Sequence, residues 1–443
     1  MLKYKVCDII SIKCKRFKRR LVKKKKRPKY ERKYFKLSKV VGIIAEYNPF
    51  HNGHSYHIQN TKVLTGADFV VAVMTGNFTQ RGNTSVVDKW EKTKMALNGG
   101  ADLVIELPTI YSISSAENFA NGAIKILNTL GIVDSISFGM EADDISTLNN
   151  ISNVLYMEPP EYKAILEHEL SKGSSFPKAR ENALMMYLND IKRYANVLKG
   201  SNNILAIEYL KALKKQKSNL VPIGVKREKV YYNSTKIIDE YASATGIRNL
   251  LLHNQLEEVR KVVPAKTYSL LLNNIRQGTY VLDITTYNNE IIYKLRSMSV
   301  KEIANLPDVS EGLEYLIKDA SNKTNNLIEL INKVKSKRYT QTRVQRILLY
   351  ALLGITKKDM EISKKMTPYI RVLGCSENGK MLLSQMNSKA KVITSFKKFE
   401  KSNKNRKIKR ILEIDKKATD IYTLGYKKES KAGLDYTKGL ILM

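Results

Sequence analysis

Hydrophobic and polar positions form a repeating pattern from residue 40 onward, in which short apolar runs alternate with longer segments of helical periodicity. The apolar runs are nearly continuous, as expected of parallel strands that are buried on both faces. The expected strands are Val40–Ala45, Asp68–Met74, Asp102–Leu107 and Val133–Phe138, and the expected helices are His54–Leu64, Asp88–Asn98 and Ala116–Leu130. Repeated strand–helix units predict an α/β fold with a Rossmann-like, doubly wound parallel sheet.

The pattern changes towards the C-terminus. Residues 147–215 have mostly helical spacing, Asn219–Val225 returns as a strand, and the strand–helix alternation weakens after about residue 255. An apolar stripe between Leu313 and Leu353 is typical of buried helix faces. Short apolar runs at Tyr369–Leu373 and Lys391–Thr394 are compatible with a small additional sheet.

These changes predict three parts. Residues 1–39 form a basic extension, residues 40–260 form the α/β domain, and residues 261–443 form a mainly helical, basic C-terminal domain.

Positive charge dominates the composition, with 77 Lys and Arg against 42 Asp and Glu and a formal net charge of +35. Residues 1–39 hold 18 of the basic residues and only two acids, so they carry +16, and the remaining chain still carries +19. This balance favours a polyanionic partner, with nucleic acid ahead of an acidic membrane. The basic runs of residues 1–39 predict disorder, and a true translation start near Leu37–Val41 is an alternative.

Cysteines and apolar segments narrow the class of protein further. Cys7, Cys14 and Cys375 form no CxxC motif or Cys/His cluster, which argues against a disulfide scaffold and against structural zinc. No apolar run reaches the roughly 18 residues of a transmembrane helix, and the run around Asp8 is a poor signal peptide. We therefore expect a cytoplasmic protein without a membrane partner.

The most informative segment is HNGH at residues 51–54, which follows the first expected strand and an Asn-Pro turn and opens a helix. Free backbone N–H groups at a helix N-terminus bind anions, so this arrangement predicts a phosphate site. Two histidines three residues apart at its entrance suggest phosphate chemistry rather than simple binding. The alternative is a pair of histidines that only cap or pack the helix. It is disfavoured because the preceding strand and Gly53 come in the order that a phosphate site requires.

Two further segments follow expected strands, at the carboxyl edge where open α/β sheets bind ligands. In TGNFTQRG (residues 75–82), Gln80 and Arg81 can contact an anion or a base, with a plain surface loop as the alternative. Gly139 allows a nucleotide to approach the backbone closely, or it serves only as a turn. Asp88 is a plausible N-cap of the helix that follows it.

The second half of the chain contributes two more motifs. SATGIR (residues 243–248) opens a helix where the Thr245 hydroxyl and the Arg248 guanidinium can hold phosphates, with a plain capped helix as the alternative. KRYTQTRVQR (residues 337–346) suits contact with an RNA backbone, with a solvated charged face as the alternative. Its candidate RNA contacts are Lys337, Arg338, Arg343 and Arg346.

Together these blocks resemble the tRNA-Met cytidine acetate ligase family, which belongs to the HxGH nucleotidyltransferase superfamily. The resemblance begins near Val40 and extends to the C-terminus. It rests on EYNPFHNGH (46–54), GNFTQRG (76–82), NNIL (202–205), SATGIR in place of the common ISxTxIR, KRYTQTR (337–343), PYIRVLG (368–374) and ATDIY (418–422).

The resemblance implies specific roles. His51 and His54 would stabilise the α-phosphate under attack, and Thr245 and Arg248 would hold the leaving pyrophosphate. One of the two asparagines Asn202 and Asn203, with Asn202 preferred, would bind ATP. The other implied ATP contacts are Ile44, Ala45, Glu46, Tyr47, Asn48, Pro49, Phe50, His51, Asn52, Gly53, His54, Ser55, Tyr56, His57, Gly139 and Arg227.

The reaction that the resemblance implies has two steps. Acetate attacks the α-phosphate of ATP, which gives acetyl-adenylate and pyrophosphate. The exocyclic amine of the wobble cytidine of elongator tRNA-Met then attacks the acetyl carbonyl, which gives N4-acetylcytidine and AMP. Whether Mg²⁺ accompanies the ATP is left open, because no set of metal ligands stands out in the sequence.

The residues themselves indicate only ATP and α-phosphate chemistry, and two alternatives stay open. A small-molecule adenylyltransferase would share both signatures but would not need a basic C-terminal domain. A non-catalytic RNA-binding protein would not need intact residues at the four candidate catalytic positions, which are His51, His54, Thr245 and Arg248.

Overall fold

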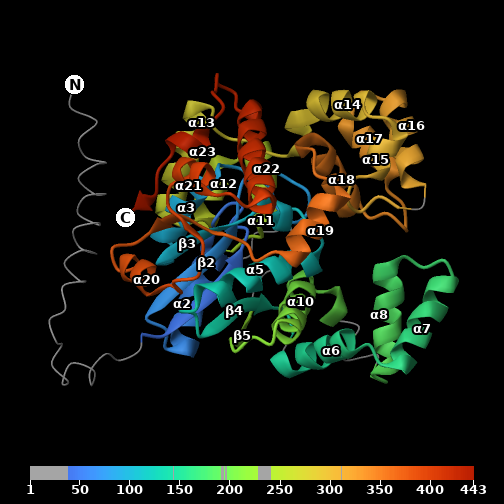
Figure 1. Cartoon of the computed structure of the whole chain (residues 1–443), viewed down its shortest axis with the longest axis horizontal. Coiled ribbons are helices and arrows are strands. Elements are labelled where there is room, and N and C mark those ends of the chain that lie inside the picture. The colour runs from blue at the N-terminus through green and yellow to red at the C-terminus, as the bar shows by residue number, and fades with distance from the viewer. Residues whose placement is uncertain (1–37, 143, 191–193, 195–196, 228–240, 311) are drawn as a thin grey trace. The chain divides into compact units, whose positions relative to one another are not determined.

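A mixed sheet lies at the centre of the fold, and the apolar runs identify its parallel strands correctly (Figure 1). The strand order is β5-β4-β1-β2-β3-β6-β7, with β8 paired to β6. The parallel part consists of β1 (Val40–Ala45), β2 (Phe69–Thr75), β3 (Leu103–Leu107), β4 (Ser135–Met140) and β5 (Val221–Lys226). The chain moves outward from β1 in both directions, which makes the sheet doubly wound with its switch point between β1 and β4.

The structure is a computed structural model that describes residues 38–142, 144–190, 194, 197–227, 241–310 and 312–443. Lys39–Met443 form a single compact unit. The predicted disorder of residues 1–39 concerns a segment that lies, except for its last two residues, outside the described residues.

Helices cover both faces of the sheet because successive residues of each buried strand point to opposite sides. Val71 and Val73 belong to one hydrophobic cluster, whereas Val70 and Ala72 belong to the other. The helices of this α/β part are α2 (Asn52–Thr65), α3 (Lys89–Asn98), α4 (Thr109–Ser112), α5 (Ala116–Leu130), α6 (Ile145–Met157), α7 (Pro160–Ser171), α8 (Phe176–Tyr187), α10 (Ser201–Lys215) and α11 (Ala244–Leu252).

Helix boundaries follow local signals. Asp88 caps α3 as expected, because its Oδ1 accepts hydrogen bonds from the backbone N–H groups of Trp90 and Glu91, both at 2.9 Å. Gly66 and Gly131 end α2 and α5 in the left-handed conformation that glycine adopts without strain.

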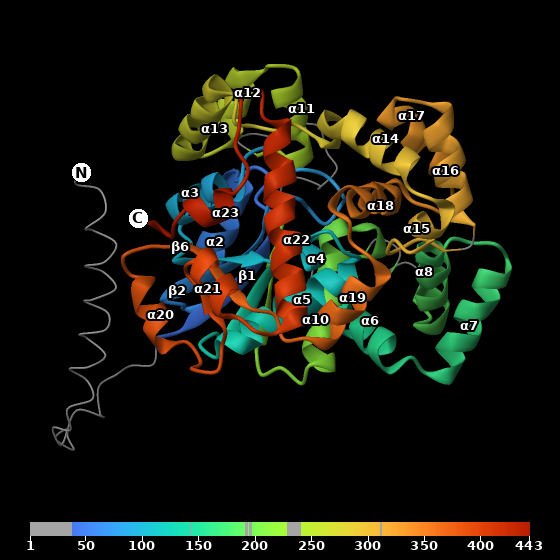
Figure 2. The same ribbon diagram turned by 45° about the horizontal axis from the view of Figure 1, so that its top comes forward.

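The second half of the chain is mainly helical, as expected, and α14–α18 form one group of helices (Figure 2). Its helices are α12 (Leu256–Val262), α13 (Ala265–Gln277), α14 (Asn288–Ser297), α15 (Val300–Ala304), α16 (Leu313–Lys323), α17 (Leu327–Val334), α18 (Gln341–Leu353), α19 (Lys357–Lys365), α20 (Lys380–Gln385), α21 (Phe396–Ser402), α22 (Arg406–Tyr422) and α23 (Leu434–Thr437). No helix in the described part of the chain is long and apolar enough to cross a membrane.

The apolar runs after residue 368 do not form a small sheet of their own. They supply β6 (Ile370–Cys375) and β7 (Val392–Ile393) to the central sheet, and β8 (Ile441–Leu442) joins them there. β6 pairs antiparallel with β3, so the backbone groups along the outer side of β3 are hydrogen-bonded rather than left as an open edge. Residues 261–443 therefore complete the sheet that residues 40–226 begin.

Candidate active site

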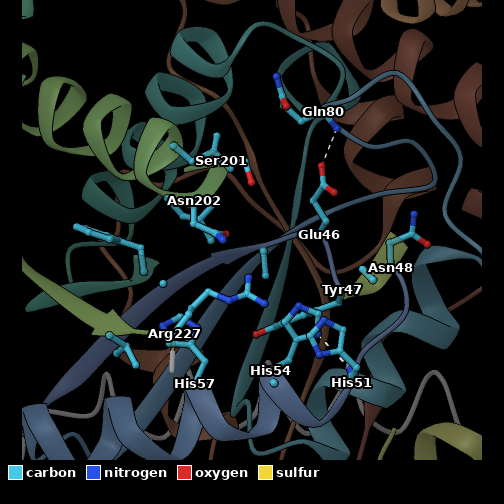
Figure 3. Close-up of a pocket in the computed structure, with 18 of the residues that line it drawn as sticks. Glu46, Tyr47, Asn48, His51, His54, His57, Gln80, Ser201, Asn202 and Arg227 are labelled. Carbon is cyan, nitrogen blue, oxygen red and sulfur yellow. Dashed lines mark hydrogen bonds between the residues drawn. The ribbon is translucent and has the colours of Figure 1, made fainter. Parts of the chain in front are cut away.

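A cavity of about 480 Å³ opens at the carboxyl ends of β1 and β4, at the switch point of the sheet (Figure 3). Its wall combines the loop after β1, the start of α2, the loop at Gln80 and Arg81, and parts of α5, α10, β5 and α18. The predicted ATP contacts that line it are Ile44, Ala45, Glu46, Tyr47, Asn48, His51, Gly53, His54, Tyr56, His57, Gly139, Asn202 and Arg227.

The two HNGH histidines lie against each other at the N-terminus of α2. The backbone N–H of His51 donates to Nδ1 of His54 at 3.1 Å, and the two rings stack with centroids 3.6 Å apart. A Cβ atom at Gly53 would lie 3.0 Å from Cε1 of His51, so glycine leaves room for this ring. Both imidazoles therefore line the cavity where the helix N-terminus favours an anion.

Burial and neighbouring cations keep these imidazoles neutral. Burial and the guanidinium groups of Arg227 and Arg248 lower the pKa of His51 to about 3. Burial, His51 and Arg227 hold the pKa of His54 well below its usual range, and burial and Arg227 lower the pKa of His57 to about 4. At neutral pH the arginines thus supply the positive charge of this part of the cavity, and the imidazoles supply hydrogen bonds.

SATGIR packs against the loop that precedes HNGH. Nη1 of Arg248 donates to the carbonyl oxygen of Asn48 at 3.0 Å, and its Nη2 donates to Oγ1 of Thr245 at 3.0 Å. Neither Thr245 nor Arg248 forms part of the cavity wall, although Ala242 and Ala244 do. The structure thus brings the two predicted signatures together, with Arg248 acting on the cavity through its charge and through the loop that it holds.

The buried amide of Asn48 fixes the same loop from the other side. Its Nδ2 donates to the carbonyl oxygen of Thr84 at 2.8 Å, and its Oδ1 accepts from the backbone N–H of Val86 at 2.8 Å. Next to it, the buried hydroxyl of Tyr47 has no hydrogen-bond partner among the described residues, and burial raises its pKa. This hydroxyl is therefore free to bond a ligand in the cavity that Tyr47 lines.

The two candidate asparagines have different positions. Asn202 lines the cavity, and its Nδ2 donates to Oε1 of Glu141 at 2.6 Å. Asn203 is buried outside the cavity wall, where its Oδ1 accepts the backbone N–H groups of Glu141 and Ala142 and its Nδ2 donates to the carbonyl oxygen of Val197. Asn202 is therefore placed where a ligand can contact it, whereas Asn203 joins β4 to α10.

Some residues of the predicted ATP segment do not reach the cavity wall, and packing explains why. Phe50 is fully buried in the hydrophobic core, where its ring approaches Gly99. The Nδ2 group of Asn52 donates to the carbonyl oxygen of Lys261 at 3.2 Å. The predicted contacts outside the wall are Pro49, Phe50, Asn52, Ser55 and Asn203.

The predicted RNA contacts fall into two groups. Lys337 and Arg338 are exposed at the loop before α18. Nε of Arg346 is ion-paired with Oδ2 of Asp308 at 3.1 Å, and Arg343 donates to the carbonyl oxygen of the same residue at 2.9 and 2.7 Å. Arg346 is also buried, so the shared helical face of these two arginines binds a neighbouring loop of the protein rather than solvent.

Several lining residues were not assigned a role in binding from the sequence. Phe119, Phe138 and Tyr209 form an apolar wall that suits a planar base, but such residues cannot be distinguished from ordinary core positions in a sequence. Thr342 also lines the cavity, and only its place in KRYTQTR offered a signal, whereas Gln80 and Arg81, which line it too, were candidate contacts in TGNFTQRG.

The described residues contain no group of three or more His, Cys, Asp or Glu side chains that could hold a metal ion. Among the described lining residues, Glu46 carries the one carboxylate. The cavity therefore combines two stacked imidazoles, a helix N-terminus, arginine charge and an apolar wall, which is a site suited to a nucleoside triphosphate.

A sheet of this topology with HxGH at its switch point defines a nucleotidyltransferase of the HIGH class, and the family model described as HIGH Nucleotidyl Transferase matches residues 38–436. A curated relative from Thermoanaerobacter sp. (strain X514), named tRNA(Met) cytidine acetate ligase, is 46% identical over 406 residues, which cover 91% of this chain and 99% of the relative. A relative of the same name from Acetivibrio thermocellus is 42% identical over 415 residues, or 91% of this chain and 100% of the relative. The chain belongs to the tRNA(Met) cytidine acetate ligase family.

Two solved structures support this assignment. The apo crystal structure of Thermotoga maritima TmcAL superposes with a TM-score of 0.87 at 33% identity, covering 91% of this chain and 99% of that one. The same Thermotoga protein bound with alpha-thio ATP superposes with a TM-score of 0.84 at 32% identity, covering 91% and 100%.

Proposed function

We propose that this protein is an ATP-dependent ligase that activates acetate as acetyl-adenylate and acetylates the wobble cytidine of elongator tRNA-Met to N4-acetylcytidine. The observation that carries the proposal is the stacked His51–His54 pair at the N-terminus of α2, inside the cavity at the sheet's switch point. The names of the relatives supply the identity of acetate and tRNA. The reaction would take place in the cytoplasm, where tRNA and ATP are available.

In the first step, an acetate oxygen attacks the α-phosphorus of ATP, and the bond from that phosphorus to the bridging oxygen breaks to release pyrophosphate. His51 and His54 donate hydrogen bonds to the phosphate oxygens, whose charge rises in the transition state. Arg227 lines the cavity and adds positive charge, while Arg248 and Thr245 support the pyrophosphate side from behind the loop.

The base of ATP would lie against the apolar wall of the cavity, beside Gly139 and Asn202. Any Mg²⁺ that accompanies ATP would be held by phosphate oxygens, because Mg²⁺ commonly binds through substrate phosphates and one or two carboxylates. The ion would increase the electrophilicity of the α-phosphorus.

Lys337 and Arg338 are the proposed RNA contacts. They are exposed, and they precede Thr342, which lines the cavity, by only a few residues of chain. Exposed cations of this kind neutralise backbone phosphates without reading the sequence of the RNA.

The test is an incubation of the purified protein with ATP, labelled acetate and unmodified elongator tRNA-Met, followed by digestion of the RNA to nucleosides. We expect label in N4-acetylcytidine, and we expect His54→Ala to lose it. His168→Ala is the matched control, because His168 is exposed on α7 and does not line the cavity.

Other outcomes point to the alternatives. Acetyl-adenylate without labelled RNA would indicate a different acceptor and favour a small-molecule adenylyltransferase. Tight RNA binding with neither product would favour a non-catalytic RNA-binding protein.

A further inference from the structure

Glu46 and Gln80 lie together on one side of the cavity, away from His57 and Arg227 (Figure 3). The imidazoles and the arginine are suited to the phosphates of ATP, so a second substrate can occupy this other side, although Glu46 falls within the segment predicted to contact ATP. Glu46 brings to it the one carboxylate among the described lining residues. A carboxylate only accepts hydrogen bonds, so at this position it suits a ligand that donates a hydrogen bond or loses a proton.

The Glu46 carboxylate is held in position by the loop beside it. Its Oε1 accepts the backbone N–H of Gln80 at 2.8 Å, and the side-chain Nε2 of Gln80 donates to the carbonyl oxygen of Ser114 at 3.0 Å. No described residue donates a hydrogen bond to the second carboxylate oxygen, Oε2. One oxygen is therefore fixed by the protein, and the other is available to a substrate.

The backbone of Glu46 is held by a buried lysine. Nζ of Lys92 donates to the carbonyl oxygen of Glu46 at 2.8 Å, to Oγ1 of Thr75 at 3.1 Å and to Oγ of Ser85 at 3.0 Å. These bonds join the end of β1 to the end of β2 and to the loop after it. Both the main chain and the side chain of Glu46 are thus positioned before any substrate binds.

The same side of the cavity adjoins the segment that we propose to bind RNA. Gly82 has a φ of +74°, and a Cβ there would lie 2.5 Å from the backbone nitrogen of Arg346, so this loop packs directly on α18. Thr342, near the start of α18, lines the cavity, and the exposed Lys337 and Arg338 precede it. An RNA backbone on these two cations can therefore place a base beside Thr342, Gln80 and Glu46.

We propose that this side of the cavity is the subsite for the acceptor cytosine and that Glu46 is the general base that takes the proton from its exocyclic N4 amine. This inference rests on the proposed function. The N4 lone pair attacks the acetyl carbonyl carbon, and the C–N bond forms as the carbonyl π pair moves to oxygen. The C=O bond then re-forms, the C–O bond to AMP breaks, and AMP leaves with that electron pair. One N4 proton passes to Glu46 and then to solvent.

The chemistry of cytosine explains why a carboxylate suffices. The N4 lone pair is delocalised into the ring, so the amine is a weak nucleophile and a weak base. Its proton becomes strongly acidic only as the new C–N bond forms, and a carboxylate in hydrogen-bond contact can take it at that moment. General base catalysis of this kind contributes about 10²- to 10⁴-fold to a rate.

The experiment measures two rates on the same preparation of full-length protein. Acetate-dependent exchange of labelled pyrophosphate into ATP reports acetyl-adenylate formation, and labelled N4-acetylcytidine reports transfer to tRNA. Glu46→Gln retains an oxygen for the N–H of Gln80 but cannot take a proton. We expect the ratio of transfer to exchange to fall about 10²- to 10⁴-fold in this variant. Any misfolded fraction lowers both rates equally and leaves the ratio unchanged.

Two further variants complete the design. Glu46→Asp retains a carboxylate, so its ratio of transfer to exchange should fall much less. This variant also tests the proposal if Glu46→Gln folds poorly. Glu167→Gln is the matched control, because Glu167 is exposed on α7, and it should leave the ratio at the wild-type value. An unchanged ratio in Glu46→Gln, or the same ratio in Glu46→Asp as in Glu46→Gln, would overturn the proposal. Absence of acetylated RNA with the wild-type protein would instead contradict the proposed function.

Discussion

Nδ2 of Asn202 lies 2.6 Å from Oε1 of Glu141, and this contact determines which end of the Asn202 amide faces the cavity. The same carboxylate accepts the backbone N–H groups of Asn202 and Asn203 at 3.2 and 2.9 Å, at a helix start whose N-cap, Gly200, has no side chain. A carboxylate only accepts hydrogen bonds, so the amide must turn its Nδ2 towards Glu141 and its Oδ1 away. No described residue donates to that Oδ1.

Glu141→Gln is expected to weaken the discrimination between ATP and GTP. If Asn202 binds the base as proposed, the N6 amine of adenine would donate to its Oδ1, whereas O6 of guanine could not. A glutamine at position 141 can donate as well as accept, so it no longer fixes the amide. Dissociation constants measured by calorimetry should show that the preference for ATP over GTP falls about 10-fold. This change corresponds to the net free energy of about one neutral hydrogen bond. An unchanged preference in a folded variant would show that Asn202 does not read the base.

Acid should destabilise the protein through its cavity histidines. The pKa of His57 is lowered to about 4 and that of His51 to about 3, mainly by burial, whereas an unfolded histidine titrates near 6.5. Between about pH 6.5 and 4 the unfolded chain binds protons that the folded chain excludes, so the free energy of unfolding decreases as the pH falls. Each histidine contributes at most about 1.4 kcal/mol per pH unit.

Urea unfolding at several pH values between 7 and 5 measures this slope. His57→Gln removes one titrating group while keeping a partner for Oγ of Ser137, which lies 3.0 Å from Nε2 of His57. The variant should have a shallower pH dependence than the wild type. An equal slope would mean that His57 titrates normally in the folded protein.

Asp435→Asn should destabilise the fold by about 3–5 kcal/mol, because it removes one of the two carboxylates that are ion-paired with two buried cations. Asp435 is ion-paired at 2.7 Å with both Lys89 and Arg371, which also bind Glu106 at 2.9 and 3.1 Å. The network joins α3, β3, β6 and α23, so it couples the C-terminal segment to the sheet.

Urea unfolding measures this loss, and an exposed ion pair provides the control. Asp319 and Lys323 lie 2.8 Å apart on the surface of α16, so Asp319→Asn should change the free energy of unfolding by less than about 1 kcal/mol. Similar effects of the two substitutions would contradict the role of the buried network.

Substitutions in KRYTQTRVQR should separate RNA binding from folding. Lys337→Ala combined with Arg338→Ala should weaken tRNA binding and reduce the slope of log affinity against log salt by about 0.7–0.9 for each RNA phosphate that is no longer neutralised. The free energy of unfolding should change little, because both side chains are exposed. Filter binding at several salt concentrations measures the slope.

Arg346→Ala is the contrasting variant. It removes a buried guanidinium that is paired with Asp308, so it should lower the free energy of unfolding. An RNA affinity that depends on Arg346 in a fully stable variant would show that this residue contacts RNA after all.

Local signals in the sequence were sufficient for the α/β framework and for the histidine pair of the cavity. The apolar runs predict β1–β4 because a strand buried on both faces needs a continuous apolar stretch. The position of HNGH after the first of these runs predicts a phosphate site, because strand, turn and helix start are neighbours in the chain. Each of these features depends on residues close together in the sequence.

Other features depend on residues far apart in the chain, and only the tertiary structure decides them. Antiparallel pairing of β6 with β3, the burial of Arg346 against Asp308 and the presence of Thr342 in the cavity wall all join distant segments. Asn202 and Asn203 are adjacent and chemically identical, yet the turn of α10 directs one into the cavity and the other towards β4. Spacing along a chain specifies the periodicity of an element, whereas packing against distant elements decides which of its side chains reach the cavity.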